Sequence, residues 1–174
     1  MSSIRRRNRS WTDMKDVVMG LRWAPPPEQR RSLEPANLDA MCVLLDVRAR
    51  RLEMVYPGRP TNANGSVIHT GDSRSGASSW DDERVFVFLD ALPAAVHSLV
   101  FGVVSSNGRS FGDVPDASCH LSDYMMEDEL LSVELTALGP LREYCVATLQ
   151  RVPSGWVMEE GAPGRRAAAE LLSV

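Results

Sequence analysis

The sequence has few cysteines, and their positions exclude the common ways of cross-linking a chain. Its 174 residues include three cysteines, Cys42, Cys119 and Cys145, which are odd in number and widely spaced. No CxxC pair and no Cys/His cluster is present, so neither a disulfide framework nor a zinc site is indicated. Each cysteine lies in an apolar segment such as "AMCVLL", which favours a buried, reduced thiol.

Long apolar runs are also lacking. The longest ones, around residues 85–89 and 99–104, are far too short to cross a bilayer. No apolar region follows the N-terminal arginines, as it would in a signal peptide. We therefore expect no transmembrane segment and a cytoplasmic protein.

Positive charge is not in excess over the chain as a whole. The net charge of −4 and the pI near 5.4 argue against specific nucleic-acid binding. Arg5, Arg6, Arg7 and Arg9 nevertheless lie within the first ten residues. We expect residues 1–12 to form a flexible basic arm, either a solubilising tail or a contact for an acidic partner. One domain over residues 13–174 should follow it.

Motifs of the familiar catalytic sites are missing. The histidines, His69, His97 and His120, are scattered, and none stands in an HExxH spacing. No GxSxG segment is present, and the glycine-containing stretches match neither the P-loop nor the dinucleotide fingerprint. A Ser/His/Asp triad is not visible in a sequence, because its members meet only in space. The sequence therefore favours a protein that is not an enzyme.

Short apolar runs separated by turn residues make up most of the chain. They occur at 17–23, 40–47, 52–56, 66–69, 84–92, 98–104, 117–122, 130–135, 144–152 and 155–159. The segment "LLSVEL" alternates, with Leu131, Val133 and Leu135 on one face. Residues 85–89 are apolar on both faces, which is typical of a central strand. Only the tail "GRRAAAELLSV" has helix composition. The pattern predicts an all-β fold, a two-sheet β-sandwich or barrel of eight or nine strands, with a short C-terminal helix.

The loop "HTGDSRSGASSWDDE", residues 69–83, opens on Asp72 and closes on three acids. From Asp72 to Glu83 it spans twelve residues, the length of an EF-hand loop, but Arg74 and Gly76 stand at two ligand positions of that motif and Ala77 where it needs glycine. Two interpretations remain on the residues alone. Either the loop folds round a hard cation that neutralises its acids, or it is a solvated acidic turn.

The chain resembles the TerD family of tellurium-resistance and stress proteins. The matching segments, in family order, are "GLRW", "NLDAMCVLLD", "NGSVIHTGDSRSG", "DDERVFVFLDALPAAVHSLVF" and "RSFGDVPDA". The resemblance covers nearly the whole chain from about Val17. It implies a sandwich of two sheets that binds calcium through acidic loops and is not known as an enzyme.

The resemblance also implies where calcium would bind. The family's Asp-Leu-Asp stretch is Asn37-Leu38-Asp39 here. Where the family has an acidic, Gly-rich stretch, this chain has "GASSW": Ala77 and Ser79 replace two acids, and Trp80 replaces a glycine. Because calcium affinity follows the ligand charge count, we expect a partly degenerate, weak site. Its candidate ligands are Asn37, Asp39, Asp72, Ser73, Asp81, Asp82 and Glu83.

The resemblance thus indicates a non-enzymatic, calcium-binding stress-response protein with an unknown protein partner. The alternative is a metal-free sandwich that serves as an interaction adapter, through the arginine arm and Trp80. The oligomeric state stays open.

The arm and the domain can be separated by deletion. Removing residues 1–10 should leave the melting temperature unchanged, because this stretch offers almost nothing apolar to bury. Thermal unfolding of the two proteins measures this. A clear loss of stability would show that Ile4 or the arginines dock on the domain.

Overall fold

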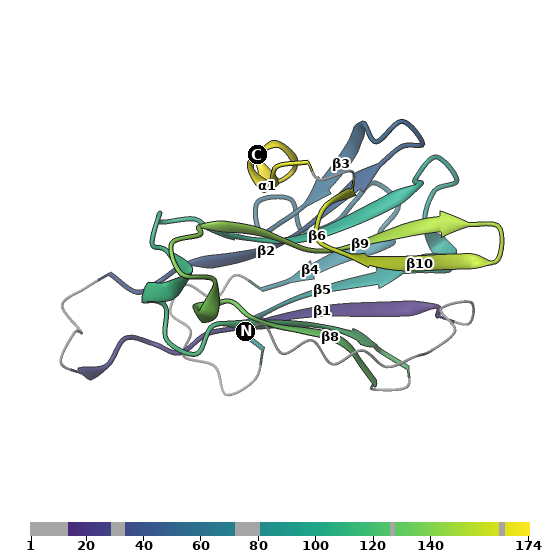
Figure 1. Cartoon of the computed structure of the whole chain (residues 1–174). Helices are drawn as coiled ribbons and strands as arrows, with labels where there is room; N and C mark the ends of the chain where they lie inside the picture. The colour runs from purple at the N-terminus through teal and green to yellow at the C-terminus, as the bar shows by residue number, and fades with distance from the viewer. Residues whose placement is uncertain (1–13, 29–33, 72–80, 126–127, 164–165) are drawn as a thin grey trace.

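The computed structural model describes residues 14–28, 34–71, 81–125, 128–163 and 166–174. These residues form ten β-strands and one short α-helix (Figure 1). The strands are β1 (Asp16–Arg22), β2 (Leu38–Leu45), β3 (Arg51–Val55), β4 (Val67–Thr70), β5 (Glu83–Phe88), β6 (Ser98–Ser105), β7 (Ser118–Asp123), β8 (Asp128–Glu134), β9 (Glu143–Val152) and β10 (Gly155–Glu160). The helix is α1 (Ala168–Leu172), and the turns η3 (Leu89–Ala91), η4 (Phe111–Asp113) and η5 (Thr136–Leu138) are 3₁₀.

The strands form two five-stranded sheets that pack face to face. The first, which we call sheet A, has the order β4-β5-β1-β7-β8, and the second, sheet B, has the order β10-β9-β6-β2-β3. Every neighbouring pair is antiparallel. The predicted two-sheet sandwich is confirmed, with one strand more than the eight or nine expected. The arm, residues 1–12, lies outside the described residues.

The side-chain alternation of the strands determines what each sheet buries. In β8, Leu131 and Val133 face the core, whereas Glu134 is exposed. In β5, Glu83, Val85 and Val87 are buried, and the residues between them face outward. The strand was predicted to be central, and it lies inside the sheet, between β4 and β1. The alternation therefore puts the acidic start of β5 partly inside the sandwich.

Sheet B is apolar on both faces because α1 covers its outer side. Met41, Val43 and Val100 form a second cluster there with Leu171 and Leu172 of the helix. Figure 1 shows α1 on the sheet B side of the molecule. This explains why β2 is a continuous apolar run and not an alternating one. The predicted C-terminal helix is confirmed, although it is only five residues long.

The three cysteines are buried free thiols, as the sequence predicted. Burial raises the pKa of Cys145 to about 11 and that of Cys119 to about 12. Such thiols remain protonated at neutral pH and are poor nucleophiles. They act as small apolar core residues.

Among the described residues, no helix is both long and apolar enough to traverse a bilayer.

The contribution of α1 can be tested with Leu172→Ala. The Leu172 side chain is 2% exposed and lies over Gly102, where an added Cβ would meet its Cδ atoms. The truncation should lower the free energy of unfolding by about 2–5 kcal/mol, as for other buried leucines. Urea denaturation measures the change. Val174→Ala is the matched control, because that side chain is 76% exposed and its loss should cost almost nothing. Equal stability of both variants would contradict this role of the helix.

Candidate functional site

The acidic loop connects β4 to β5 at one end of sheet A. β4 ends at Thr70, and Gly71 turns the chain with a φ of 78°, a conformation that favours glycine. Residues 72–80 lie outside the described part, and with them the predicted ligands Asp72 and Ser73. The structure does place the residues that follow the loop, and it places Asn37 and Asp39 at the start of β2.

Glu83 is a buried carboxylate that links the two sheets. Its side chain is inaccessible to solvent, and Oε2 accepts hydrogen bonds from the Ala40 amide at 2.8 Å and from His69 Nε2 at 3.1 Å. Oε1 is also buried but makes no hydrogen bond to any described residue. Burial raises the pKa of Glu83 from its usual 4.5 to about 7, and the negative charge of Asp39 adds to the rise. The carboxylate therefore lies in a site that favours either a proton or a positive charge.

Asn37 and Asp39 lie on the same stretch of backbone, two residues apart. Asp39 accepts a hydrogen bond from the Ser106 hydroxyl, and the Asn37 carbonyl accepts one from the Ser106 amide at 2.8 Å. The side-chain oxygen of Asn37 is buried and makes no hydrogen bond within the described residues. The repulsion between Asp39 and Glu83 shows that their charges interact. Buried, electron-rich oxygens thus flank the start of β2.

Asp82 has a structural partner. Its side chain is largely buried, and Oδ2 accepts a hydrogen bond from the Trp23 amide at 3.0 Å. Its own amide donates to the Leu21 carbonyl at 2.8 Å. Asp82 therefore extends the pairing of β5 with the end of β1.

Asp81 points to the outer face of sheet A. Its Oδ2 lies 3.0 Å from His120 Nε2 and 3.2 Å from Arg84 Nε. Burial alone raises the pKa of Asp81, but the hydrogen bonds and charges of His120 and Arg84 outweigh this and hold the pKa below its usual value. Asp81 therefore stays ionised.

The side chains of Asp81, Asp82 and Glu83 thus lie in three different environments. Among the described residues, no three His, Cys, Asp or Glu side chains gather closely enough to hold a metal ion. The prediction that these acids share a cation with Asp72 and Ser73 stays a prediction, because residues 72–80 lie outside the described part of the chain.

Sequence reasoning missed both histidine contacts. His69, near the end of β4, is buried, and its Nε2 lies 3.1 Å from Glu83 Oε2. His120 is part of a hydrogen-bonded group on the outer face, with Ser122 Oγ 2.8 Å from its Nδ1. The i, i+2 spacing of His120 and Ser122 does put them on one face of a strand. Their link to Asp81, however, depends on the pairing of β7 with β1, which the sequence does not show.

Comparison with known proteins identifies the family. The family model described as the TerD domain matches residues 7–170, which is most of the chain.

The chain belongs to the TerD domain family.

Named relatives agree with this assignment. The chain is 35% identical over 151 residues to the tellurium resistance protein TerZ of Serratia marcescens, covering 82% of this chain and 77% of that protein. It is 28% identical over 129 residues to general stress protein 16U of Bacillus subtilis, covering 70% and 66%. A crystal structure of a TerD homologue from Streptomyces coelicolor superimposes with a TM-score of 0.75 at 23% identity, covering 91% of this chain and 94% of that one. The likeness to the crystal structure shows the same fold.

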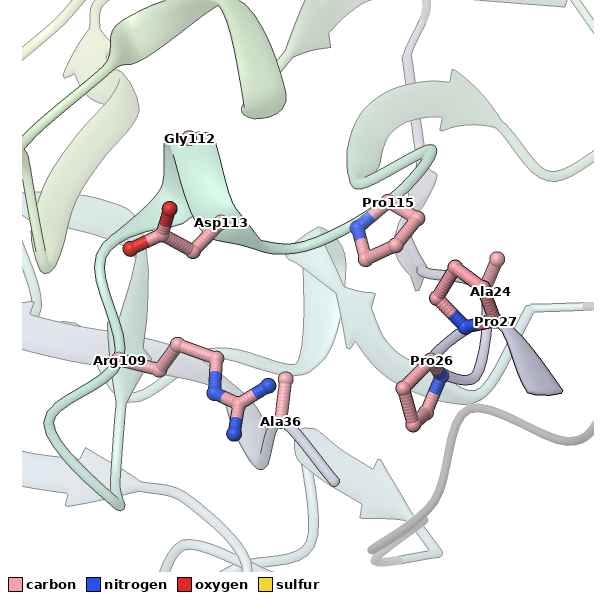
Figure 2. Close-up of a pocket in the computed structure, with 8 residues that line it drawn as sticks. All are labelled: Ala24, Pro26, Pro27, Ala36, Arg109, Gly112, Asp113 and Pro115. Atoms are coloured by element: carbon pink, nitrogen blue, oxygen red, sulfur yellow. The ribbon is translucent and has the colours of Figure 1, made fainter. Parts of the chain in front are cut away.

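A pocket of about 490 Å³ lies at the end of this TerD domain, between the loop after β1 and the turn η4 (Figure 2). Figure 2 shows the Arg109 side chain extending toward Ala36, with Pro26, Pro27 and Pro115 grouped on the other side. Arg109 donates a hydrogen bond to the Glu34 carbonyl. Its described hydrogen bond thus goes to the loop backbone. This arginine stabilises the loop that borders the pocket.

The buried Glu83 predicts a pH dependence of stability. Because its pKa is raised from 4.5 to about 7, the folded protein keeps a proton that the unfolded chain has released. The stabilisation is complete below pH 4.5 and is lost as the pH rises through about 7. Glu83→Gln carries no charge, so its stability relative to the parent should increase by up to about 3 kcal/mol between pH 5 and pH 8.

Urea denaturation in the presence of a chelator measures this difference at each pH. Glu134→Gln is the control, because Glu134 is exposed on β8. A difference between Glu83→Gln and the parent that does not change with pH would contradict the raised pKa.

Proposed function

We propose that this TerD-family chain is a calcium-binding stress-response protein, in which the acidic loop acts by binding and not by catalysis. The observation that carries the proposal is the buried Glu83, with one carboxylate oxygen that no described residue satisfies. A divalent cation beside this oxygen would neutralise a charge that burial makes costly. The printed names of the relatives, which refer to tellurium resistance and to general stress, support the stress-response role.

The available donors fit calcium by type. Glu83, Asp39 and Asn37 offer carboxylate and amide oxygens, the ligands that this hard cation prefers. Calcium takes six to eight oxygens, so Asp72, Ser73 and backbone carbonyls of the loop complete the proposed set. Asp82 Oδ2 already accepts from the Trp23 amide, and Asp81 Oδ2 already contacts His120 and Arg84. These two acids are therefore the weaker candidates of the seven.

We propose that the protein works in the cytoplasm. It would act through a protein partner of the stress response and would not bind nucleic acid specifically. Three buried free thiols in one small domain fit a reducing compartment. The alternative function, a metal-free interaction adapter, rests on the arginine arm and Trp80, both outside the described residues.

Calcium titration of the metal-stripped protein tests the proposal. Calcium should bind more tightly than magnesium and raise the melting temperature, because a ligand that binds only the folded state stabilises it. Glu83→Gln should weaken binding at least about tenfold, or roughly 1.4 kcal/mol. Isothermal titration calorimetry at constant ionic strength measures the affinities, and thermal unfolding measures the melting temperature. Glu134→Gln again serves as the control for a lost carboxylate on the same sheet. No heat of binding and no thermal shift at millimolar calcium would favour the adapter.

Restoring the acids of the family tests the degenerate site. Ala77→Glu with Ser79→Asp adds two carboxylates to the loop and should increase calcium affinity at least about tenfold, because anionic oxygens determine the affinity of such sites. Without calcium, the same variant should be less stable, most visibly at low salt, because like charges repel. Calorimetry and thermal unfolding measure the two effects. Affinity equal to that of the parent would mean that the loop does not enclose the ion.

A further inference from the structure

The outer face of sheet A carries a hydrogen-bonded group that the calcium proposal does not use. Asp81, His120 and Ser122 lie in a row: Asp81 Oδ2 is 3.0 Å from His120 Nε2, and Ser122 Oγ is 2.8 Å from His120 Nδ1. Asp81 lies two residues before β5, the other two lie on β7, and β1 lies between these strands. The sequence separates the members by up to 41 positions, so only the fold brings them together.

The chemistry of the three groups fixes the position of the protons. An ionised carboxylate only accepts hydrogen bonds, so His120 Nε2 carries the proton shared with Asp81. In a neutral imidazole the other nitrogen, Nδ1, is then an acceptor, and the Ser122 hydroxyl donates to it. This is the arrangement of a general base beside a nucleophile, with the carboxylate orienting the imidazole.

Gly20 makes the contact possible. It pairs with His120 on β7 and with Arg84 on β5, directly beneath the group. A Cβ at this position would come closer than 3.0 Å to both His120 Nε2 and Asp81 Oδ2. Any larger residue would therefore separate the imidazole from the carboxylate.

A groove of about 230 Å³ adjoins the group, lined in part by Phe86 and Tyr124. These two rings pack edge to face with centroids 5.5 Å apart, which gives the groove an apolar wall. Arg84 lines it as well, and only its Nε takes part in the contact with Asp81. The terminal guanidinium nitrogens are thus suited to stabilise a developing negative charge. Asp81 and Asp123 also line the groove, so it favours an uncharged substrate.

We propose that Ser122, His120 and Asp81 form a second site, one that hydrolyses small uncharged acyl esters. Ser122 Oγ attacks the acyl carbonyl and passes its proton to His120 Nδ1. The C–O bond to the alcohol then breaks, and that proton leaves with the alcohol. Water, deprotonated by His120, attacks the resulting acyl-serine, releases the carboxylic acid and restores the Ser122 hydroxyl. Asp81 does not touch the substrate and is a positioning residue.

An uncharged alkyl fluorophosphonate tests the nucleophile directly. Ser122 Oγ should displace fluoride and form a phosphonyl adduct, which peptide mass spectrometry locates. The adduct should be absent in Ser122→Ala and in His120→Gln, which removes the base. Ser118→Ala is the matched control, because Ser118 lies on the same strand and face. In parallel, hydrolysis of p-nitrophenyl butyrate should fall at least about a hundredfold in both active-site variants, the usual contribution of such a base.

Gly20→Ala tests whether the reaction of Ser122 needs the contact between His120 and Asp81. It keeps nucleophile and base but should abolish the adduct by displacing the flexible ends of His120 and Asp81. Circular dichroism confirms that each variant is folded. The adduct and hydrolysis assays contain chelator. Calcium binding of Ser122→Ala, titrated without chelator, should equal that of the parent, so this proposal and the calcium proposal fail independently. No adduct on Ser122 of the folded parent, or butyrate hydrolysis unchanged in Ser122→Ala, would overturn it.

Discussion

The fold depends on how the buried carboxylate of Glu83 is satisfied. Its Oε2 bonds to the amide of Ala40 in one sheet and to His69 in the other, so a single side chain links the layers at the end where the acidic loop begins. An isolated charge in this position is too costly to persist, and three agents can neutralise it: a proton, the imidazolium form of His69 or an external cation. Protons and cations therefore compete for one group. The same competition connects the stability of the sandwich to whatever the loop binds.

The acids that follow the loop point in different directions where the chain enters β5. Glu83 faces the interior with Val85 and Val87, whereas Asp81 reaches His120 and Arg84 on the outer face. Asp82, between them, accepts from the Trp23 amide. A contiguous acidic segment in the sequence is therefore not a contiguous cluster in space.

Much of the fold was predictable, because local patterns determine it. The alternation of Leu131, Val133 and Leu135 and the two-sided apolar character of residues 85–89 correspond to the observed strands. The TerD resemblance gave the sheet architecture, which the family match supports. The contacts of the site were not predictable in the same way. They depend on which strands are neighbours and in which register, as in the pairing of Gly20 with both Arg84 and His120. A single sequence contains no direct signal for such pairs.

Asp81 connects the two candidate sites physically. Its Oδ2 accepts hydrogen bonds from both His120 and Arg84. In the sequence it is separated from the buried Glu83 only by Asp82. A cation that drew Asp81 toward the loop would have to replace two charge-assisted hydrogen bonds, which are the stronger kind. It would also release His120 from the partner that fixes its tautomer and leave the Arg84 guanidinium without its described acceptor. Recruiting Asp81 Oδ2 to an ion in the loop would therefore disrupt the group on the outer face, whereas a calcium site built on Glu83, Asp39 and Asn37 leaves the outer face unchanged.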